Sequence, residues 1–544
     1  MSNLLEKASI ITTPTAYSDG VLHSVKPEQT LGSELVVNGD FSNGSTDWTL
    51  NDWTVADGKA SLVNGSSFIT QALVLQSGKT YKIQYTISDY VSGNIRWRSA
   101  GVNGSVNTSN GLVTDFITVA GSSFAIQGYN SFTGSISNIS AKEVTDADFT
   151  FTRNDAGTRV NASGNIESVG VDLPRIDYLG GSGSWLLEPE ATNTATYSND
   201  FSQGTIFISS SDASTTNGVI ITANATTSPE GLTNASKIQI GTTNSGFNRL
   251  RYTTANMVSG NINTLSIFAK KGSGVDWLGI FVDGIDASSR AWFDLENGVL
   301  GNKSAAVINH KIEDYGNGWY RCSISFSTSV DTNGVVSFVI TDGNGGTSYA
   351  GDLTDHHFIY GLQAESHATR EYATSYIPTS EGTGTRAADS AIDAGSSDLI
   401  SSTEGVLYAE ISALATGTNH RYISLSDGTA NNRFIIRYIS GGVSQIGVFC
   451  RVGGVTQFNL FKVMTDITNY SKVALKYGLN NFALWIDGVE VGTDTSAIVP
   501  AKNTLNQISF EDATGGAYFH GNTKGLQLFD KALSDYQLKQ LTTI

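Results

Sequence analysis

Three features of the 544-residue sequence predict an all-β protein built from tandem β-sandwiches. Glycine is abundant, with 58 residues, and proline is scarce, with 7, as expected for many short strands joined by tight turns. Apolar and polar residues alternate in short segments such as YKIQYTIS, which is the period of a half-buried strand. Helical spacing is convincing only in the C-terminal LFDKALSDYQLKQLTTI, where Ser534 is a suitable N-cap and Leu538 and Leu541 lie three residues apart.

The charge balance limits the kinds of molecule that the chain is expected to bind. The chain carries 33 Lys and Arg against 50 Asp and Glu, a net charge of −17. An acidic surface disfavours nonspecific binding to nucleic acid or anionic membranes. The first residues, MSNLLEKASI, lack the features of a signal peptide, and no apolar run could span a bilayer. We therefore predict no nucleic-acid partner and no membrane insertion. Cys322 and Cys450 fall in different predicted domains among core residues, which predicts two buried free thiols.

The first two parts of the chain are an arm and a sandwich. Residues 1–31 are too few for a core. They are predicted either to pack on the first domain or to dock the chain into a larger assembly. Residues 32–146 form the first predicted sandwich, because short apolar runs recur there between turn signals. The resemblance described below implies that this sandwich is a jelly roll.

Three further parts follow. Residues 147–193 form a connector rich in turns, which we expect to pack along the middle domain through its apolar residues Leu173, Ile176, Leu186 and Leu187. Residues 194–382 form a second jelly roll, because SNDFSQG at 198–204 echoes NGDFSNG at 38–44. Residues 383–544 form a third sandwich that ends in the helix, with Asp487-Gly488 as a tight turn between two of its strands.

Several motifs resemble known proteins. TRVNASGNIESV, PRIDY and LLEPEATN in the connector closely resemble a segment of many tailed-bacteriophage virion proteins, especially tail and fibre proteins. DYGNGWYRCSISF and TSYIPTSEGTGTRAADS are common in the same proteins, and the N-terminal residues look like the start of a set of them. The first sandwich, from ELVVNGDFSNGSTDWTL to SISNISAKEV, resembles jelly-roll carbohydrate-binding modules. The third resembles laminin G or concanavalin A-like domains.

The resemblance implies a virion structural protein, such as a tail fibre, spike or head-attached fibre, that presents lectin-like domains to host-surface or environmental glycans. It implies synthesis in the host bacterial cytoplasm, a place in the virion, contacts with other virion proteins through residues 1–31, and a homo-oligomer. Fibre proteins are often trimers, although the sequence has no heptad run. A decoration protein with a purely architectural role and a polysaccharide depolymerase are the alternatives.

An enzymatic role is not predicted. The sequence contains no GxSxG, P-loop or HExxH motif. The Glu-x-Asp-x-x-Glu strand pattern of concanavalin-like glycosidases is absent from the third domain. A glycosidase needs two carboxyl groups close together on a cleft, and the sequence pattern indicates no such pair.

Sugar-binding side chains are predicted from strand alternation, because a flat aromatic ring stacks on the apolar face of a pyranose. In VDWLGIFVD, Trp277 and Phe281 are expected to face outward, as is Trp292 in SRAWFDLENG. Arg96 and Arg98 are expected to be exposed on either side of a core tryptophan in NIRWRSA. For the two outward tryptophans, packing against the connector or another subunit is the alternative.

Calcium is the one metal that the sequence suggests. Jelly-roll sugar-binding modules often hold a structural Ca²⁺ with loop carboxylates and backbone carbonyls. Glu34, Asn38 and Asp40 match the place of such ligands in the first domain. The alternative is that these residues form turns, for which Asn and Asp are well suited.

Overall fold

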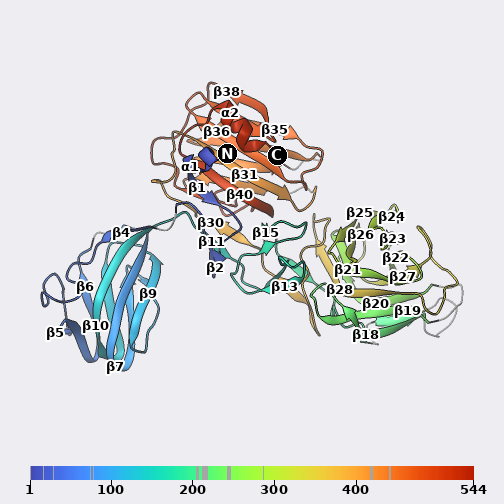
Figure 1. The fold of residues 1–544 in the computed structure, drawn as a ribbon, viewed down its shortest axis with the longest axis horizontal. Helices are drawn as coiled ribbons and strands as arrows, with labels where there is room; N and C mark the ends of the chain where they lie inside the picture. The colour runs from blue at the N-terminus through green and yellow to red at the C-terminus, as the bar shows by residue number, and fades with distance from the viewer. Residues whose placement is uncertain are drawn as a thin grey trace. The chain divides into compact units, whose positions relative to one another are not determined.

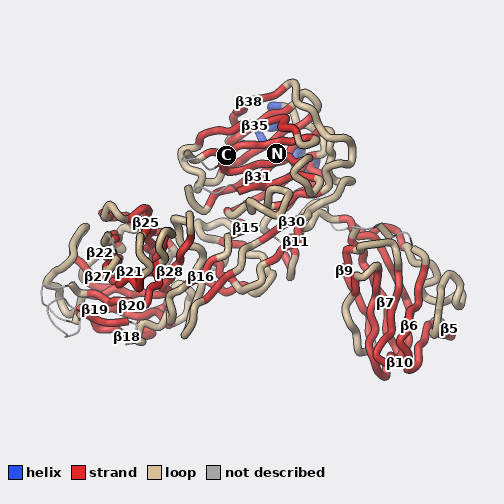
Figure 2. The backbone as a smooth tube through the Cα atoms, turned by 180° about the vertical axis from the view of Figure 1, so that it is seen from behind, coloured by secondary structure: helices blue, strands red, loops and turns tan. Residues whose placement is uncertain are grey.

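The computed structural model describes residues 2–543 apart from 16, 28–29, 74, 77–78, 204–206, 211–217, 242–246, 286, 417–420 and 440–442. Antiparallel sheets provide nearly all of the regular structure, with two short helices in the described part, which confirms the predicted all-β class (Figure 1 and Figure 2). The chain forms two compact units, Lys26–Asp146 and the combination of Met1–Val25 with Ala147–Ile544. Among the described residues, no helix is long and apolar enough to cross a membrane.

Three long strands build most of the 26–146 unit, and they bend. β10 pairs with β7 on both sides of a register break between Tyr129 and Thr133. Asn130 and Ser131 take positive φ there, and such a break in the ladder bends a strand as a bulge does. The strands of this unit are β4 (Thr30–Glu34), β5 (Thr54–Ala56), β6 (Lys59–Gln71), β7 (Thr80–Ser99), β8 (Val102–Asn103), β9 (Gly111–Thr118) and β10 (Phe124–Thr145).

The two halves of β7 face the same core. Tyr81 and Ile83 from its first half and Ile95 and Trp97 from its second half are at most 1% exposed and belong to one apolar cluster. Successive side chains of a strand point to opposite faces, so this inward set leaves the alternate residues on the outer face. Each large apolar side chain buried here contributes about 1.5–3 kcal/mol.

The middle of the chain forms a sandwich of two six-stranded sheets around its own apolar core. One sheet has the order β17 (Phe207–Ser210), β20 (Arg249–Met257), β27 (Thr332–Thr341), β22 (Trp277–Asp283), β23 (Ser289–Asp294), β24 (Val299–Lys303). The other has the order β18 (Val219–Thr227), β19 (Thr233–Ile240), β28 (His356–His367), β21 (Ile262–Ser273), β26 (Trp319–Ser327), β25 (Val307–Asp314).

The C-terminal sandwich packs an eight-stranded sheet against a five-stranded one. The larger sheet contains β14 and β15 from the connector, β40 (Gly521–Phe529), β31 (Glu404–Ala413), β36 (Ser471–Gly478), β37 (Phe482–Ile486) and β38 (Val489–Asp494), with β1 also paired to β40. The smaller has the order β35 (Val455–Val463), β34 (Gln445–Val452), β33 (Arg433–Ile439), β32 (Arg421–Ser426), β39 (Gln507–Ser509). The predicted helix is present as α2 (Asp535–Thr542), with Ser534 and Gln537 forming a capping box and Leu538 buried.

The connector is divided between the two sandwiches of its unit. Its hairpin of β12 (Gly157–Val160) and β13 (Ile166–Val169) packs Val160 and Ile166 against the middle sandwich. By contrast, β14 (Ile176–Asp177) and β15 (Ser184–Leu187) extend the C-terminal sheet, and Ile176 and Leu187 enter that core. The prediction that these two residues pack on the middle domain is therefore wrong, because β15 pairs with β40. The remaining short strands are β11 (Phe149–Thr152), β16 (Ala191–Asn193), β29 (Gly384–Arg386) and β30 (Ser390–Ile392).

The N-terminal residues, predicted as a docking arm or as packing on the first domain, belong to the C-terminal sandwich. After helix α1 (Ser2–Lys7), strand β1 (Ala8–Thr12) pairs with β40, and Ile10 is fully buried in the C-terminal core. The hairpin of β2 (Tyr17–Ser18) and β3 (Val21–Leu22) pairs with β11. Both chain ends therefore lie on one sandwich, as the labels N and C show in Figure 1. The N-terminal segment, for which the resemblance suggested docking to another protein, thus packs within its own chain.

Candidate functional site

The predicted residues Arg96 and Arg98 lie on the outer face of the 26–146 sandwich. They alternate along β7 with the buried Ile95 and Trp97, and each is about half-buried rather than fully exposed. The neighbouring strand β10 runs antiparallel, and its Gln127 stands directly opposite Arg96. On the other side of β10, the same Gln127 stands opposite Phe68 of β6. A row of outward side chains thus crosses three adjacent strands.

Both guanidinium groups are oriented by one amide oxygen and by aromatic rings. Arg96 donates through Nε and Nη2 to Gln127 Oε1, each at 3.2 Å, and Arg98 donates through Nη1 to the same oxygen at 3.4 Å. The guanidinium carbon of Arg96 lies 4.7 Å from the ring centroid of Tyr129, and that of Arg98 lies 5.7 Å from the ring centroid of Phe68. We call Phe68, Arg96, Arg98, Gln127 and Tyr129 the Arg96 face.

The electrostatics of the Arg96 face are unusual for so acidic a chain. Within the described residues, neither Arg96 nor Arg98 forms an ion pair with a carboxylate, and most of their N–H groups donate to no protein atom. An arginine presents five N–H donors in a planar fork that matches a carboxylate or phosphate in a bidentate manner. The face can therefore bind an anion while its rings contact an apolar surface.

Three residues of this face were not predicted: Phe68, Gln127 and Tyr129. Their positions alternate with the buried Ile69 and Ile126, so their outward direction could be found from the sequence. The strand register places Gln127 beside both Arg96 and Phe68 and so joins residues from strands far apart in the chain. Alternation alone does not predict this pairing.

The aromatic sugar platform predicted on the middle sandwich is covered. Trp292 and Phe281 do lie on the outer side of their sheet, but they are 7% and 0% exposed and form a small apolar cluster with Val339. Trp292 Nε1 donates to the Gly346 carbonyl at 2.6 Å, which holds the 343–346 loop over the ring. Trp277 is partly buried at the edge of this cluster. The prediction that Trp292 and Phe281 offer open rings is wrong, because Trp292 donates to the distant 343–346 loop and Phe281 packs against Trp292 and Phe247.

The predicted calcium ligands make internal hydrogen bonds. Glu34 Oε1 accepts from the backbone N–H of Val36 and Ala141 at 3.1 and 2.8 Å. Asp40 Oδ1 accepts from the N–H and hydroxyl of Ser42, and these hydrogen bonds lower the pKa of Asp40. Asn38 Oδ1 accepts from the N–H of Asn43 within the same loop. The described part of the chain holds no group of three or more His, Cys, Asp or Glu side chains able to bind a metal ion. Calcium at this loop stays a prediction, and the internal hydrogen bonds favour its alternative, in which the three residues form turns.

A cavity of about 220 Å³ lies where the connector meets the two sandwiches of its unit. Its wall includes the carboxyl groups of Asp177 and Glu313 and the rings of Tyr315 and Tyr372. Burial raises the pKa of Asp177, although its two oxygens accept backbone N–H groups at 2.7 and 3.0 Å. Glu313 pairs with Lys311 at 2.7 Å. The carboxyl groups of Asp177 and Glu313 therefore already have partners within the protein.

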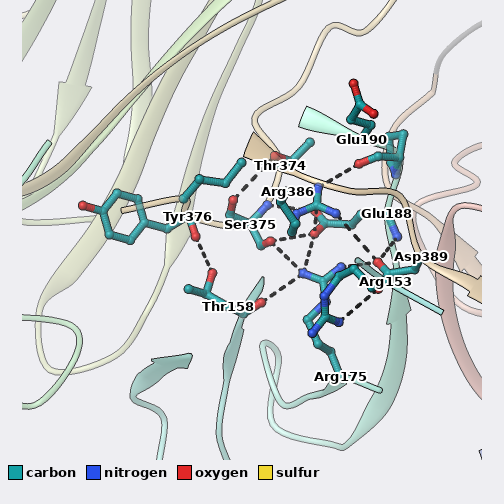
Figure 3. Close-up of polar contacts among 12 residues, drawn as sticks. Arg153, Thr158, Arg175, Glu188, Glu190, Thr374, Ser375, Tyr376, Arg386 and Asp389 are labelled. Carbon is teal, nitrogen blue, oxygen red and sulfur yellow. Dashed lines mark hydrogen bonds and ion pairs between the residues drawn. The ribbon is translucent and has the colours of Figure 1, made fainter. Parts of the chain in front are cut away.

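Beside the cavity, three buried arginines surround two buried carboxylates (Figure 3). Arg175 donates to Glu188 Oε2 at 2.7 Å and to Asp389, while Arg153 donates to Asp389 Oδ1 at 3.2 Å. Arg386 lies 3.5 Å from Glu188 and 3.8 Å from Asp389. Burial alone would raise the pKa of Glu188, but the guanidinium groups of Arg386 and Arg175 hold it well below its usual range. We call these five residues the connector ion network.

The connector ion network was not predicted, although four of its five residues stand in the motifs that carried the resemblance. Arg175 belongs to PRIDY, Glu188 to LLEPEATN, and Arg386 and Asp389 to TSYIPTSEGTGTRAADS. The last of these motifs is separated from the first two by the whole middle sandwich. The role of these motifs in this chain is to hold the connector against the entry to the C-terminal sandwich.

No protein-family model and no curated protein matches the chain. Solved structures with partial similarity include the Ruminococcus gnavus IT-sialidase CBM40 bound to alpha2,3 sialyllactose, with 18% identity over 26% of this chain and 83% of that chain and a TM-score of 0.23. Domain 4 of AbnA, a GH43 extracellular arabinanase from Geobacillus stearothermophilus in complex with arabinotriose, has 12% identity over 32% and 84%, with a TM-score of 0.23. Domains LG4-5 of the mouse laminin alpha1 chain have 9% identity over 55% and 91%, with a TM-score of 0.19. At such identities and TM-scores, no argument about this chain rests on these matches.

Proposed function

We propose that the chain is a glycan-binding adhesion protein that recognises carboxylated glycans through the Arg96 face. The observation that carries this proposal is the pair Arg96 and Arg98, oriented by Gln127 and lacking a carboxylate partner among the described residues. Their planar forks match a sugar carboxylate, and Tyr129 and Phe68 add apolar contact for a pyranose ring. In a chain of net charge −17, a pair of arginines without acidic partners favours an anionic ligand at that position.

The test uses the full-length protein on immobilised polygalacturonate and on the same polymer after reduction of its carboxyl groups. Arg96→Met with Arg98→Met keeps the apolar stems and removes both charges. We expect the double variant to lose about 10-fold to 100-fold in affinity, the range for hydrogen bonds to charged groups. Lys59→Met is the matched control, because Lys59 lies in the same unit but pairs with Asp89 at 3.0 Å. Equal binding to the reduced polymer, or an unchanged double variant, would refute the proposal.

We propose that this adhesion serves a tailed-phage virion, in which the chain is a structural protein such as a fibre or spike. The support is the resemblance of the connector motifs to virion proteins. The protein would be made in the bacterial cytoplasm and would assemble with other virion proteins as a homo-oligomer. Mass spectrometry and immunogold labelling of purified particles test this role. Presence in the particle without binding to any glycan would favour the architectural alternative.

We propose that binding occurs without hydrolysis. The cavity at the connector is the place where a depolymerase would act, but Glu188 is held in the connector ion network and Asp177 accepts two backbone N–H groups. We expect no new reducing ends after prolonged incubation with any polymer that the protein binds. Release of reducing ends that Asp177→Asn abolishes would establish the enzyme instead.

A further inference from the structure

We infer that the C-terminal sandwich carries a second binding site for carboxylated glycans, on the outer face of its five-stranded sheet. The inference rests on the proposed function only for the class of ligand, because the residues lie in a different sandwich. Arg437 of β33 is central. Its neighbours Ile436 and Tyr438 are at most 1% exposed in the core, so alternation directs Arg437 outward.

Strand pairing surrounds Arg437 with the same kinds of side chain as the Arg96 face. Tyr422 of β32 stands directly opposite Arg437, and its ring centroid lies 5.9 Å from the guanidinium carbon. Phe449 of β34 lies on the other side, with its ring centroid at 5.0 Å. Asn459 of β35 accepts a hydrogen bond from Nη2 at 2.9 Å. The guanidinium group is therefore held between two rings and oriented by one amide oxygen.

The charge of Arg437 has no acidic partner among the described residues. Its Nε is buried beside the rings and forms no hydrogen bond in the described structure. The other outward arginine of β33 is different, because Arg433 Nη1 lies 3.5 Å from Asp512 Oδ2. One arginine of this strand is thus neutralised by the protein, and the other remains available to an anion.

The surface next to Arg437 carries an exposed aromatic ring. Gly447 stands opposite Arg437 on β34 and is itself buried. A Cβ at Gly447 would lie 2.5 Å from the Leu460 carbonyl oxygen and 2.8 Å from the Cβ of Phe461, which explains the glycine. Phe461, opposite Gly447 on β35, is 50% exposed. A carboxylate on Arg437 would place the attached ring beside Phe461, where it could stack. We call Tyr422, Arg437, Phe449, Asn459 and Phe461 the Arg437 face.

The decisive experiment counts sites on the full-length protein by equilibrium dialysis with a fluorescent tetragalacturonate. We expect two sites per chain in the wild type, one in Arg437→Met, one in the Arg96→Met, Arg98→Met variant, and none in the triple variant. Arg437→Lys keeps the charge but loses the planar fork, so we expect affinity at this site to fall about 10-fold. Lys462→Met, which removes one charge from the same sheet, is the matched control and should keep two sites.

The outcomes separate this inference from the proposed function. Loss of one site on Arg437→Met, with no loss on Arg96→Met, Arg98→Met, would support the Arg437 face and refute the Arg96 face. An unchanged number of sites in Arg437→Met would overturn the inference, whatever the other variant does. Absence of binding to the wild type would overturn both. Calorimetric transitions equal to those of the wild type show that each variant is folded.

Discussion

Removing one charge from the connector ion network should destabilise the 147–544 part of the chain without affecting the 26–146 unit. Glu188→Gln keeps the shape of the side chain but leaves three buried arginines with one carboxylate. Glu188 accepts from Arg175 at 2.7 Å and from the N–H and hydroxyl of Ser375 at 2.8 and 2.6 Å. Breaking a buried ion pair by removing one partner costs about 3–5 kcal/mol, because the remaining charge is left buried without compensation.

The expected shift in melting temperature follows from the size of the unit. An unfolding entropy of about 2.1 cal/mol/K per residue over roughly 420 residues converts this loss to about 3–6 °C, if the unit unfolds cooperatively. Differential scanning calorimetry measures it, and the transition of the 26–146 unit should not move. Glu404→Gln is the matched control, because Glu404 pairs with the exposed Lys531 and its loss should leave the transition in place. A shift below about 1 °C for Glu188→Gln would refute the reasoning, since 3 kcal/mol predicts several degrees.

Three further predictions follow from buried and turn-forming groups. Cys322 and Cys450 are buried and unpaired, as predicted from the sequence, and burial raises the pKa of both thiols. Ellman's reagent should therefore label neither thiol in the native protein and both thiols in denaturant. Rapid labelling of the native protein would contradict this prediction. Burial lowers the pKa of His357 to about 4, below the usual 6.5, so the unfolded state binds the proton more readily and stability falls as pH drops through this window. Between pH 7 and 5, His357 should account for about 2 kcal/mol of the lost free energy of unfolding. Urea unfolding of His357→Gln should show a correspondingly smaller dependence of this free energy on pH. An unchanged dependence would show that His357 is not the group responsible. Because the oxygens of Glu34, Asn38 and Asp40 already accept hydrogen bonds, EDTA should not lower the melting temperature of the 26–146 unit, whereas a drop reversed by Ca²⁺ would establish the metal site.

Local alternation predicted the strands and the direction of their side chains, but it could not predict which strands pair. Arg96 and Arg98 were correctly placed outward because Ile95 and Trp97 alternate with them on the same strand. The hydrogen bond from Ser9 to Leu528 joins residues 519 positions apart, and no local pattern contains that pairing. The N-terminal residues were therefore given a separate domain, although they complete the last sandwich.

The same limit explains the errors at the middle sandwich. Trp292 and Phe281 do alternate outward, yet outward on a strand means only away from one core. The Gly346 carbonyl, more than fifty positions along the chain, accepts from Trp292, and Phe247 packs edge-on against Phe281. An outward aromatic residue is a candidate platform only when nothing distant covers it. An outward arginine indicates an open surface more reliably than an outward aromatic residue does. Burying a guanidinium group without a partner for its charge costs free energy.

The residues of the virion-like motifs and the arginines suited to a ligand lie in different places in the structure. The motifs that resemble virion proteins place Arg175, Glu188 and Asp389 in a buried network, where their charges are paired with one another. The arginines suited to a ligand, such as Arg96 and Arg437, lie on sheet faces outside those motifs. Family and ligand specificity can therefore vary independently in such a protein. Glu188→Gln should lower the free energy of unfolding while the number of glycan sites stays the same. Arg96→Met should weaken glycan binding while the free energy of unfolding stays the same. If Glu188→Gln removed a glycan site from the folded protein, the network would have to be part of the binding machinery, and this division of roles would fail.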